Sequence, residues 1–347
     1  SNNIINRMSF VFDTNNNKLV ITYNNSGNNR GYIRVGNVDN NSMLYGDQIE
    51  ICSTELLNSE LCVDYNSNKL VIFYTTSNTH YVKVGSLSGN SITIGTEVIL
   101  NVSNVSKMYP IYDPVNNNII VFYNSSNNLV YKIGTVTGNS ITFTSETIVH
   151  SYTTDVLSVF YNTNGNQIVL AYADTNNSNY GTIKLGTVLN NNITFGNGVI
   201  FNYNYVQNLS ICYINSGKFV IAYDDKDNNN IAGIIGEITD STITLGNTSV
   251  LYESATWQNE TFYKSLKCMY NTSSSRIIVS FINHTNNNMC INSGVIYNTN
   301  DIMWNKGVEH MILSTSVTFM AIEIDNNNKT ICLYDVSNVS KYRIGSE

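Results

Sequence analysis

Short apolar runs separated by Asn-rich polar turns recur along the chain, and residues 61–100 show the pattern most clearly. This segment consists of LCVDY, the turn NSN, KLVIFY, a polar loop, HYVKVGSL, the turn SGN and finally SITIGTEVIL. Runs of this length, rich in Val, Ile and Tyr and bounded by Asn, Gly and Ser, are typical of strands joined by tight turns. The segment therefore predicts a four-stranded antiparallel meander.

The same pattern repeats through the whole sequence. An aromatic residue ends the second strand of each copy, and successive copies lie 49 to 58 residues apart: Tyr23, Tyr74, Tyr123, Tyr172, Tyr223, Phe281 and Tyr334. A glycine in the third strand recurs at similar intervals: Gly36, Gly85, Gly134, Gly186, Gly236, Gly294 and Gly345. Both markers count seven copies, and the recurring aromatic is expected to pack in the core.

Four-stranded units at such a period are the signature of propeller blades, because one sheet cannot bury both of its faces and must stack on neighbours. The sequence therefore predicts an all-β, seven-bladed β-propeller that forms a single domain over residues 1–347. A β-sandwich has no fixed repeat and a parallel β-helix has a shorter one, so both remain minor alternatives. The blades are expected at residues 8–54, 55–102, 103–153, 154–204, 205–254, 255–315 and 316–347.

The last unit is shorter than the others. It supplies FMAIEID, KTICLYD and KYRIG but no counterpart of the fourth strand. Aligning Met8 with Met108 places residues 1–7 in a loop between blades, so they are not expected to provide it. Three explanations stay open: the last blade has three strands, residues upstream of Ser1 complete it, or a neighbouring molecule adds a strand.

The repeated phrase is similar to that of a known family. VKVGSLSGNSITIGTEVIL and YKIGTVTGNSITF resemble the VGxVxGxSITFGT-type propeller repeats found in phage and virus structural and tail-fibre proteins. The resemblance covers nearly the whole chain and is weakest in the sixth unit. It implies a propeller on a virion surface or outside a cell, with binding or host attachment as its role. It transfers no catalytic residue, because the motif consists of strand and turn positions.

Charge and hydropathy exclude several classes of partner. The formal net charge of −7 has the wrong sign for tracking phosphates, so nucleic acid is not expected as a partner. No run approaches the roughly 18 apolar residues that span a bilayer, so no membrane insertion is expected. The polar start SNNIINRMSF lacks the apolar segment of a secretory signal, but a chain that begins with Ser1 can be a processed product or a fragment. The extracellular or virion location therefore follows from the resemblance alone.

The cysteines show no metal-binding spacing. Buried free thiols are favoured over a disulfide framework, because all six lie on strand-like segments where thiols pack as small apolar groups. They are Cys52, Cys62, Cys212, Cys268, Cys290 and Cys332.

Catalytic motifs are missing from the sequence. The four histidines fall at unrelated phases of the repeat, and the chain contains no P-loop, nucleophile elbow or dinucleotide fingerprint, so neither an enzyme nor a cofactor is expected. Four aspartates at the end of the first strand could supply the carboxylate pair of a glycoside hydrolase. Turn formation is favoured instead, because Asp accepts backbone N–H bonds in hairpins. These residues are Asp13, Asp64, Asp113 and Asp325.

One loop has a weak calcium pattern. In AYDDKDNNNIAG, the residues Asp225, Asp227 and Asn229 alternate as the ligands of a calcium loop do. The loop lacks the glycine at the sixth position and the distal Glu, so calcium is only a weak prediction.

Aromatic residues among polar neighbours mark the candidate binding surface. Such residues in loops of variable length have the composition of a carbohydrate or protein contact. For the insertion ESATWQNETFYKS, the alternative is a lid whose aromatic side chains pack onto the body of the protein. The candidates are Tyr203 and Tyr205 in FNYNYVQN, and Trp257, Glu260, Phe262 and Tyr263 in the insertion ESATWQNETFYKS.

Three functions follow from these observations. The first is a lectin-like, non-catalytic binding module that recognises a glycan or a host-surface protein through one face of the propeller. The alternative is a structural or decoration protein joined to other subunits of a particle or fibre through open blade edges. A glycoside hydrolase or lyase is the third, weakened by the missing catalytic motif. The fold is compatible with all three.

Overall fold

The computed structural model describes residues 5–39, 42–102, 107–154, 156–253, 266–283, 288–305, 310–313, 317–327, 329–336 and 339–345. Strands make up 71% of the structure and the described residues contain no helix, which confirms the predicted all-β class. The chain divides into two compact units, Ser1–Thr153 with Glu323–Ser346 and Thr154–Ile322 with Glu347. The single domain predicted from the sequence stays a prediction.

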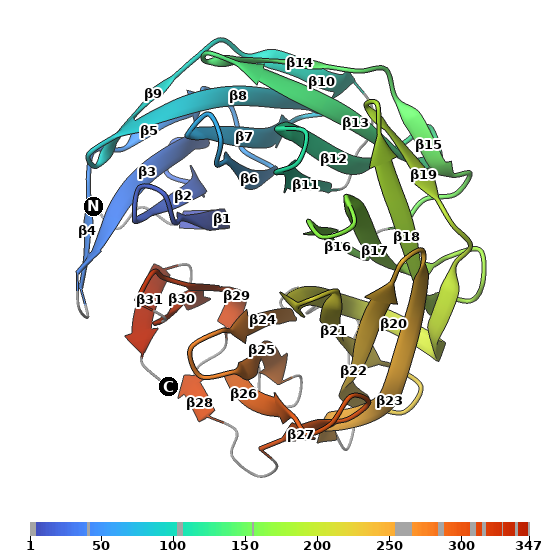
Figure 1. Ribbon diagram of the computed structural model, residues 1–347. Coiled ribbons are helices and arrows are strands. Elements are labelled where there is room, and N and C mark those ends of the chain that lie inside the picture. The colour runs from blue at the N-terminus through green and yellow to red at the C-terminus, as the bar shows by residue number, and fades with distance from the viewer. Residues whose placement is uncertain are drawn as a thin grey trace. The chain divides into compact units, whose positions relative to one another are not determined.

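Three five-stranded antiparallel sheets occupy residues 5–102 and 108–150 of the first unit (Figure 1). Sheet A contains β1 (Ile5–Asp13), β2 (Lys18–Asn25), β3 (Arg30–Asp39), β4 (Ser42–Tyr45) and β5 (Ile49–Cys52). Sheet B contains β6 (Asn58–Asp64), β7 (Lys69–Thr76), β8 (Thr79–Ser88), β9 (Ser91–Ile94) and β10 (Val98–Val102). Sheet C contains β11 (Met108–Asp113), β12 (Asn118–Ser125), β13 (Asn128–Thr137), β14 (Ser140–Phe143) and β15 (Thr147–His150).

The next two repeats share one strand, which joins them into the eight-stranded sheet D. Its strands are β16 (Leu157–Asn162), β17 (Gln167–Asp174), β18 (Tyr180–Leu189), β19 (Asn192–Phe195), β20 (Val199–Asn215), β21 (Lys218–Asp225), β22 (Asn230–Thr239) and β23 (Thr242–Glu253). Sheet E contains β24 (Lys267–Asn271), β25 (Arg276–Asn283), β26 (Asn288–Ile296), β27 (Ile302–Trp304) and β28 (His310–Leu313).

The last sheet, sheet F, has three strands in the described residues, β29 (Val317–Ile324), β30 (Thr330–Val336) and β31 (Val339–Gly345). Strand β1 pairs with β2 from Ile5 onward. The sequence prediction that residues 1–7 lie in a loop between blades is therefore wrong for residues 5–7, which form the start of β1 in sheet A.

The second strand of each repeat is the most buried element. The aromatic residue near its end is 0 to 3% exposed at each of Tyr23, Tyr74, Tyr123, Tyr172, Tyr223 and Phe281, which confirms that it belongs to the core. The seventh copy, Tyr334, lies outside the side chains that the structure describes. Burial raises the pKa of Tyr123, whose hydroxyl donates to Glu146 Oε1 at 2.7 Å. The hydroxyl of Tyr74 donates to Glu97 in the same way.

The fourth strand differs from the sequence prediction. The run SITIGTEVIL forms two short strands, β9 and β10, which pair with opposite halves of β8. The register of β10 against β8 slips by one residue at Leu100, and the corresponding slip in sheet A falls at Ile51. This repeated β-bulge turns an apolar side chain inward, since Leu100 and Ile51 are 2% and 1% exposed.

Successive sheets of the first unit hold one another through the turn between the third and fourth strands. Lys69 Nζ donates to Asn139 Oδ1 at 3.0 Å, and Lys18 Nζ donates to Asn90 Oδ1 at 2.9 Å. A Cβ atom at Gly95 would collide with the backbone oxygen of Asn139, so only glycine allows this approach. We call this lysine, asparagine and glycine arrangement the inter-sheet clamp.

The recurring aspartates form turns, as the sequence interpretation favours. Asp113 Oδ1 accepts the backbone N–H groups of Val115 and Asn116 at 3.0 Å each, and its Oδ2 accepts Asn116 Nδ2 at 2.8 Å. Asp13, Asp64 and Asp325 also each accept two backbone N–H groups of their own turn. The carboxylates therefore stabilise the hairpins that join the first and second strands.

The abundance of asparagine also has a structural role. Among the residues that the structure describes, ten asparagines adopt a positive φ, a backbone conformation that Asn tolerates better than most residues. They are Asn17, Asn29, Asn68, Asn117, Asn127, Asn166, Asn179, Asn190, Asn191 and Asn229.

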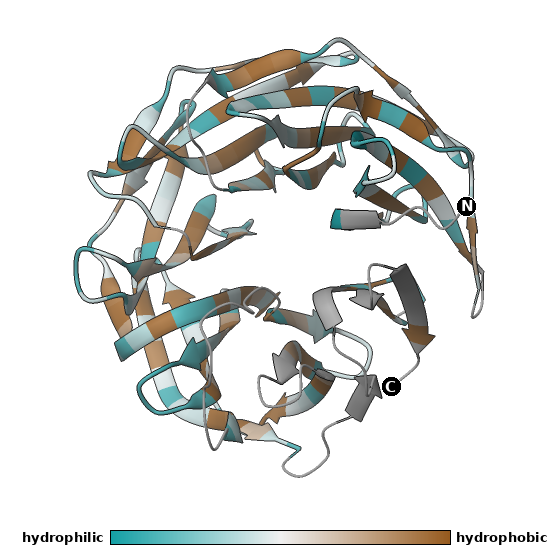
Figure 2. Cartoon of the chain, turned by 180° about the vertical axis from the view of Figure 1, so that it is seen from behind, coloured by the Kyte–Doolittle hydropathy of each residue, from teal (hydrophilic) through white to brown (hydrophobic). Residues whose placement is uncertain are grey.

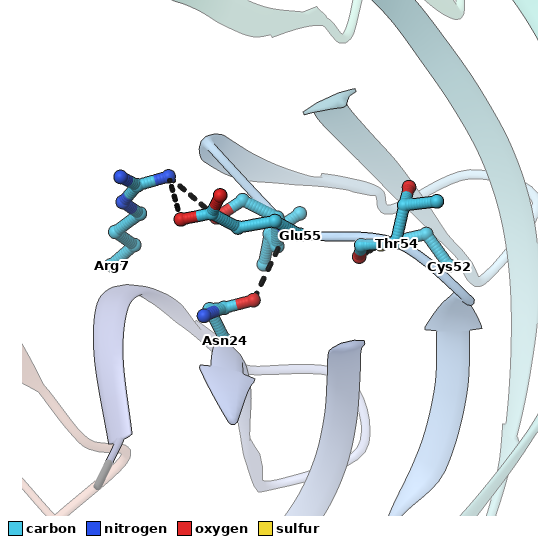
Figure 3. Close-up of polar contacts among 6 residues, drawn as sticks. Arg7, Asn24, Cys52, Thr54 and Glu55 are labelled. Carbon is cyan, nitrogen blue, oxygen red and sulfur yellow. Dashed lines mark hydrogen bonds and ion pairs between the residues drawn. The ribbon is translucent and has the colours of Figure 1, made fainter. Parts of the chain in front are cut away.

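The connection from sheet A to sheet B is fixed by polar contacts (Figure 3). Asn24 Oδ1 accepts the backbone N–H of Leu56 at 3.0 Å, and Arg7 Nη1 donates to the Leu56 carbonyl at 3.3 Å. Arg7 also pairs with Glu55 at 3.1 Å, but both side chains are more than a third exposed, so this ion pair adds little stability. Leu56 itself is fully buried.

The hydrophobic core lies between neighbouring sheets. Val20 and Ile33 of sheet A pack in one cluster with Leu70 and Ile72 of sheet B, and sheets B and C share another cluster. In the second unit, the β20–β23 half of sheet D packs against sheet E. Figure 2 shows hydrophobic residues along the strands and hydrophilic residues at many of the turns.

Candidate binding surface on strand β20

Strand β20 is 17 residues long and serves two repeats. Its first half pairs with β18, and its second half pairs with β21. The sequence FNYNYVQN lies where the strand passes from one partner to the other. Tyr203 and Tyr205, predicted from the sequence as ligand contacts, therefore lie at a junction between repeats.

A second register shift occurs at this junction, as it also does between β22 and β23 of the same sheet. In the pairing of β18 with β20, Gly181 faces Asn202 while the adjacent Tyr180 faces Tyr205. Two additional residues, Tyr203 and Asn204, are thus inserted on β20. The pairings of β5, β10, β15 and β28 with their third strands show a single register shift each. Bulges re-aim side chains and are frequent beside functional sites.

The insertion places aromatic rings at the surface. Tyr203 is 70% exposed, and its ring lies edge-on to that of Tyr180, with the centroids 5.8 Å apart and the planes at 69°. This geometry is a favourable one for two aromatic rings. Tyr180 and Tyr205 are half-buried and face each other across the strand pair. We call Tyr180, Tyr203 and Tyr205 the tyrosine ridge.

The turn between β21 and β22 folds back onto the ridge. Lys226 Nζ lies 5.0 Å from the centroid of the Tyr205 ring, within range of a cation–π contact. Asp227 Oδ2 accepts the backbone N–H of Tyr205 at 3.0 Å, and the Lys226 N–H donates to the Tyr205 carbonyl at 3.0 Å. The ridge is therefore bordered by a cation, an exposed carboxylate and the amides of Asn202 and Asn204.

Buried residues beneath the ridge fix the backbone of β20. Phe201 is 6% exposed, its ring contacts that of Tyr223 at 5.2 Å, and it fills the space left by the missing side chain of Gly181. Asp224 is also buried and accepts a hydrogen bond from Asn208 Nδ2 at 2.7 Å. Burial raises the pKa of Asp224 to about 7, and the bond from Asn208 opposes the shift.

The residues of the weak calcium pattern form part of the same turn. Asp225 Oδ2 accepts Asn204 Nδ2 at 3.0 Å and Asn228 Nδ2 at 2.9 Å, while its Oδ1 accepts the Asn228 N–H at 3.1 Å. Asn229 adopts a positive φ of 52°. Both carboxylate oxygens of Asp225 thus already accept N–H groups, whereas calcium binding would need them as ligands. Within the described ranges, no three His, Cys, Asp or Glu side chains lie close enough to hold a metal ion, and calcium binding at this turn stays a prediction.

The structure brings together only part of the predicted site. Trp257, Glu260, Phe262 and Tyr263 lie outside the described residues, so their relation to the ridge stays a prediction. Tyr180 and Lys226 were not identified from the sequence. Tyr180 begins β18 after an Asn-rich turn and Lys226 lies in the turn after β21, and neither belongs to a motif. The register of β18 against β20 brings Tyr180 beside Tyr203 and Tyr205, and the backbone hydrogen bond to Tyr205 brings Lys226 there.

No helix among the described residues has the length and hydrophobicity that crossing a membrane requires. The chain matches no known family model, and no curated protein is significantly similar to it in sequence.

Proposed function

We propose that this protein is a lectin-like binding module of the propeller type, with seven blades, that works on a virion surface or outside a cell and recognises a glycan through the tyrosine ridge. The observation that carries the proposal is the exposure of Tyr203 on an insertion that interrupts an otherwise regular repeat. Tyr203 contacts Tyr180 but takes no part in the hydrophobic core, and a departure from the repeat that leaves a large aromatic side chain in solvent favours a functional role.

The propeller architecture is supported by the sequence repeat and by contacts within the first unit. The recurring aromatic and glycine residues each mark seven repeats at similar intervals. The inter-sheet clamp joins sheet A to sheet B and sheet B to sheet C by the same residues. Asn326, which follows β29, donates to the backbone oxygen of Thr14 at 2.9 Å, so the last repeat contacts the first.

The chemistry of the ridge suits a sugar. An exposed aromatic ring offers an apolar face for the C–H groups of a pyranose at little cost in side-chain entropy. The neighbouring Asn202 and Asn204 amides can donate and accept hydrogen bonds, Lys226 donates and Asp227 accepts, which matches the alternating donors and acceptors of sugar hydroxyl groups. None of these groups resembles a nucleophile with an adjacent base, so binding without catalysis is proposed.

A glycan array tests this function. Purified full-length protein is screened, and each hit is measured by isothermal titration calorimetry with the wild type and with Tyr203→Ala. We expect the substitution to weaken binding by tenfold or more, as for an aromatic residue at the centre of a contact, which corresponds to about 1.4 kcal/mol.

The matched control is Tyr297→Ala. Tyr297 is 71% exposed and lies in the same unit but outside the ridge, so its removal is expected to leave affinity unchanged. Equal losses in the two variants would show that the ridge is not the site. Binding to a host-surface protein but to no glycan would show that the ligand is a protein and not a glycan.

Assembly into a particle or fibre is a second candidate, favoured by one observation. In the described residues, β31 pairs with β30 and with no other strand. A strand from a neighbouring subunit could pair with its other edge. Sedimentation velocity over a range of concentrations tests this: concentration-dependent association supports assembly between copies, and a constant monomer opposes it.

A further inference from the structure

Two cysteines far apart in the sequence meet inside the second unit. Cys212 on β20 and Cys268 on β24 are 8% and 6% exposed, and their sulfur atoms lie 2.9 Å apart. A disulfide has an S–S length of about 2.05 Å, so the two sulfur atoms need to approach by only about 0.9 Å to form one.

A hydrogen bond and apolar packing hold these two strands together without help from the sulfur atoms. The N–H of Cys268 donates to Ser210 Oγ at 3.0 Å, and both cysteines belong to the apolar cluster between sheets D and E. The same contact occurs one repeat earlier, where the N–H of Ile211 donates to Ser158 Oγ at 3.1 Å. The position that corresponds to Cys212 is there occupied by Phe160. The thiols thus meet at a regular contact between neighbouring repeats.

We propose that Cys212 and Cys268 form a disulfide that links β20 to β24 when the protein folds in the presence of a disulfide oxidant. The sequence favours unpaired thiols, whereas the distance of 2.9 Å between these two sulfur atoms favours a disulfide. The proposal does not depend on glycan binding, since neither cysteine belongs to the tyrosine ridge.

The chemistry is thiol–disulfide exchange with a small-molecule disulfide such as oxidised glutathione. One cysteine thiolate attacks the oxidant, which breaks the S–S bond of the oxidant, forms a mixed disulfide and releases one glutathione thiolate. The second cysteine thiolate attacks the mixed disulfide, which forms the Cys212–Cys268 bond and releases the other glutathione. The protein loses two hydrogen atoms, and one oxidised glutathione becomes two reduced ones.

Burial determines when the reaction takes place. The pKa of Cys268 is raised well above its ordinary value because the thiol is buried, and its proximity to Cys212 raises it further. The thiolate is therefore scarce in the folded protein, and exchange is slow there. We expect the bond to form during folding, while the thiols are still accessible.

Peptide mass spectrometry tests the link directly. Full-length protein is refolded with a mixture of oxidised and reduced glutathione, alkylated, and digested with trypsin without reduction. The expected product joins the peptides of residues 185–218 and 268–276, which contain Cys212 and Cys268, and its mass is two hydrogens below the sum of the two. Recovery of both peptides in alkylated form would overturn the proposal, and so would a link from either cysteine to another partner.

Thermal unfolding provides a second readout. The bond closes a loop of 57 residues, so protein refolded with glutathione is expected to melt roughly 10 °C above protein refolded with a phosphine reductant. Cys212→Ser should abolish this difference, whereas Cys62→Ser, at a buried cysteine of sheet B, should keep it. If Cys212→Ser does not fold, the peptide result on the wild type still decides.

Discussion

Replacing Asp224 by Asn is expected to stabilise the protein at neutral and alkaline pH and to have little effect in acid. Asp224 is 3% exposed at the end of β21, and Asn208 Nδ2 donates to its Oδ2 at 2.7 Å. An asparagine at this position has nearly the same shape and retains a carbonyl oxygen to accept that bond. The substitution therefore removes the buried charge and little else.

The sign and size of the effect follow from the pKa of the carboxyl group. Burial raises the pKa of Asp224 to about 7, against 3.8 in an unperturbed chain. Below pH 3.8 the group is protonated in both states. Between pH 3.8 and 7 only the unfolded state loses the proton, so the free energy of unfolding falls as pH rises. Above pH 7 the folded protein also carries the buried charge, and the loss of stability is complete. Each unit of difference in pKa corresponds to about 1.36 kcal/mol, so the cost reaches about 4 kcal/mol.

The assay is urea denaturation at several pH values from 4 to 8.5, followed by intrinsic fluorescence, for the wild type, Asp224→Asn and the control Asp240→Asn. Asp240 is an exposed turn residue of the same unit, so its substitution makes the same chemical change in solvent. The free energy of unfolding of Asp224→Asn should rise relative to the wild type as pH increases. A difference that stays constant between pH 4 and pH 7, or one that Asp240→Asn reproduces, would refute the reasoning.

Three further substitutions test the fold. Gly95→Ala should lower the free energy of unfolding by about 1 to 3 kcal/mol because the added Cβ would collide with a neighbouring turn. Gly89→Asn, at an open position with positive φ, should leave it unchanged in the same urea titration. Asp113→Ala should cost about 1 to 3 kcal/mol because the turn loses the hydrogen bonds that the buried carboxylate accepts from Val115 and Asn116. Asp113→Asn should recover part of this, and equal losses would contradict the turn role. Tyr123→Phe should lower the thermal midpoint by a few degrees because the Glu146 carboxylate keeps Ser125 but loses Tyr123 as a donor. An unchanged midpoint would show that the Tyr123–Glu146 bond is energetically neutral.

Local patterns predicted most of the strand order. The alternation of apolar runs and turn residues located the antiparallel hairpins. The regular recurrence of an aromatic residue near the end of the second strand identified Tyr74 and Tyr123 as core residues. The turn role of Asp113 could be predicted because it depends only on residues two and three positions away. Features of this kind are encoded within a single hairpin.

Contacts that depend on register could not be predicted. The fourth strand divides at Gly95, where a turn of the next sheet approaches, and the glycine alone does not reveal that contact in the sequence. Tyr180 lies beside Tyr203 only because two additional residues enter β20, and a single different slip would place other side chains there. The meeting of Cys212 with Cys268 likewise depends on how two sheets align across 56 residues.

The inter-sheet clamp gives the contacts of sheet A with sheet B and of sheet B with sheet C a direction, since lysine and glycine come from one sheet and the asparagine turn from the next. Stability in such an array is a sum of terms between nearest neighbours, so a change in one repeat is felt by two others and no further. Loops that take no part in the clamp can therefore diverge without disturbing the rest of the chain. The junction at Tyr203 is such a place, because β20 accommodates two additional residues there while the pairings of β5, β10 and β15 with their third strands keep a single register shift.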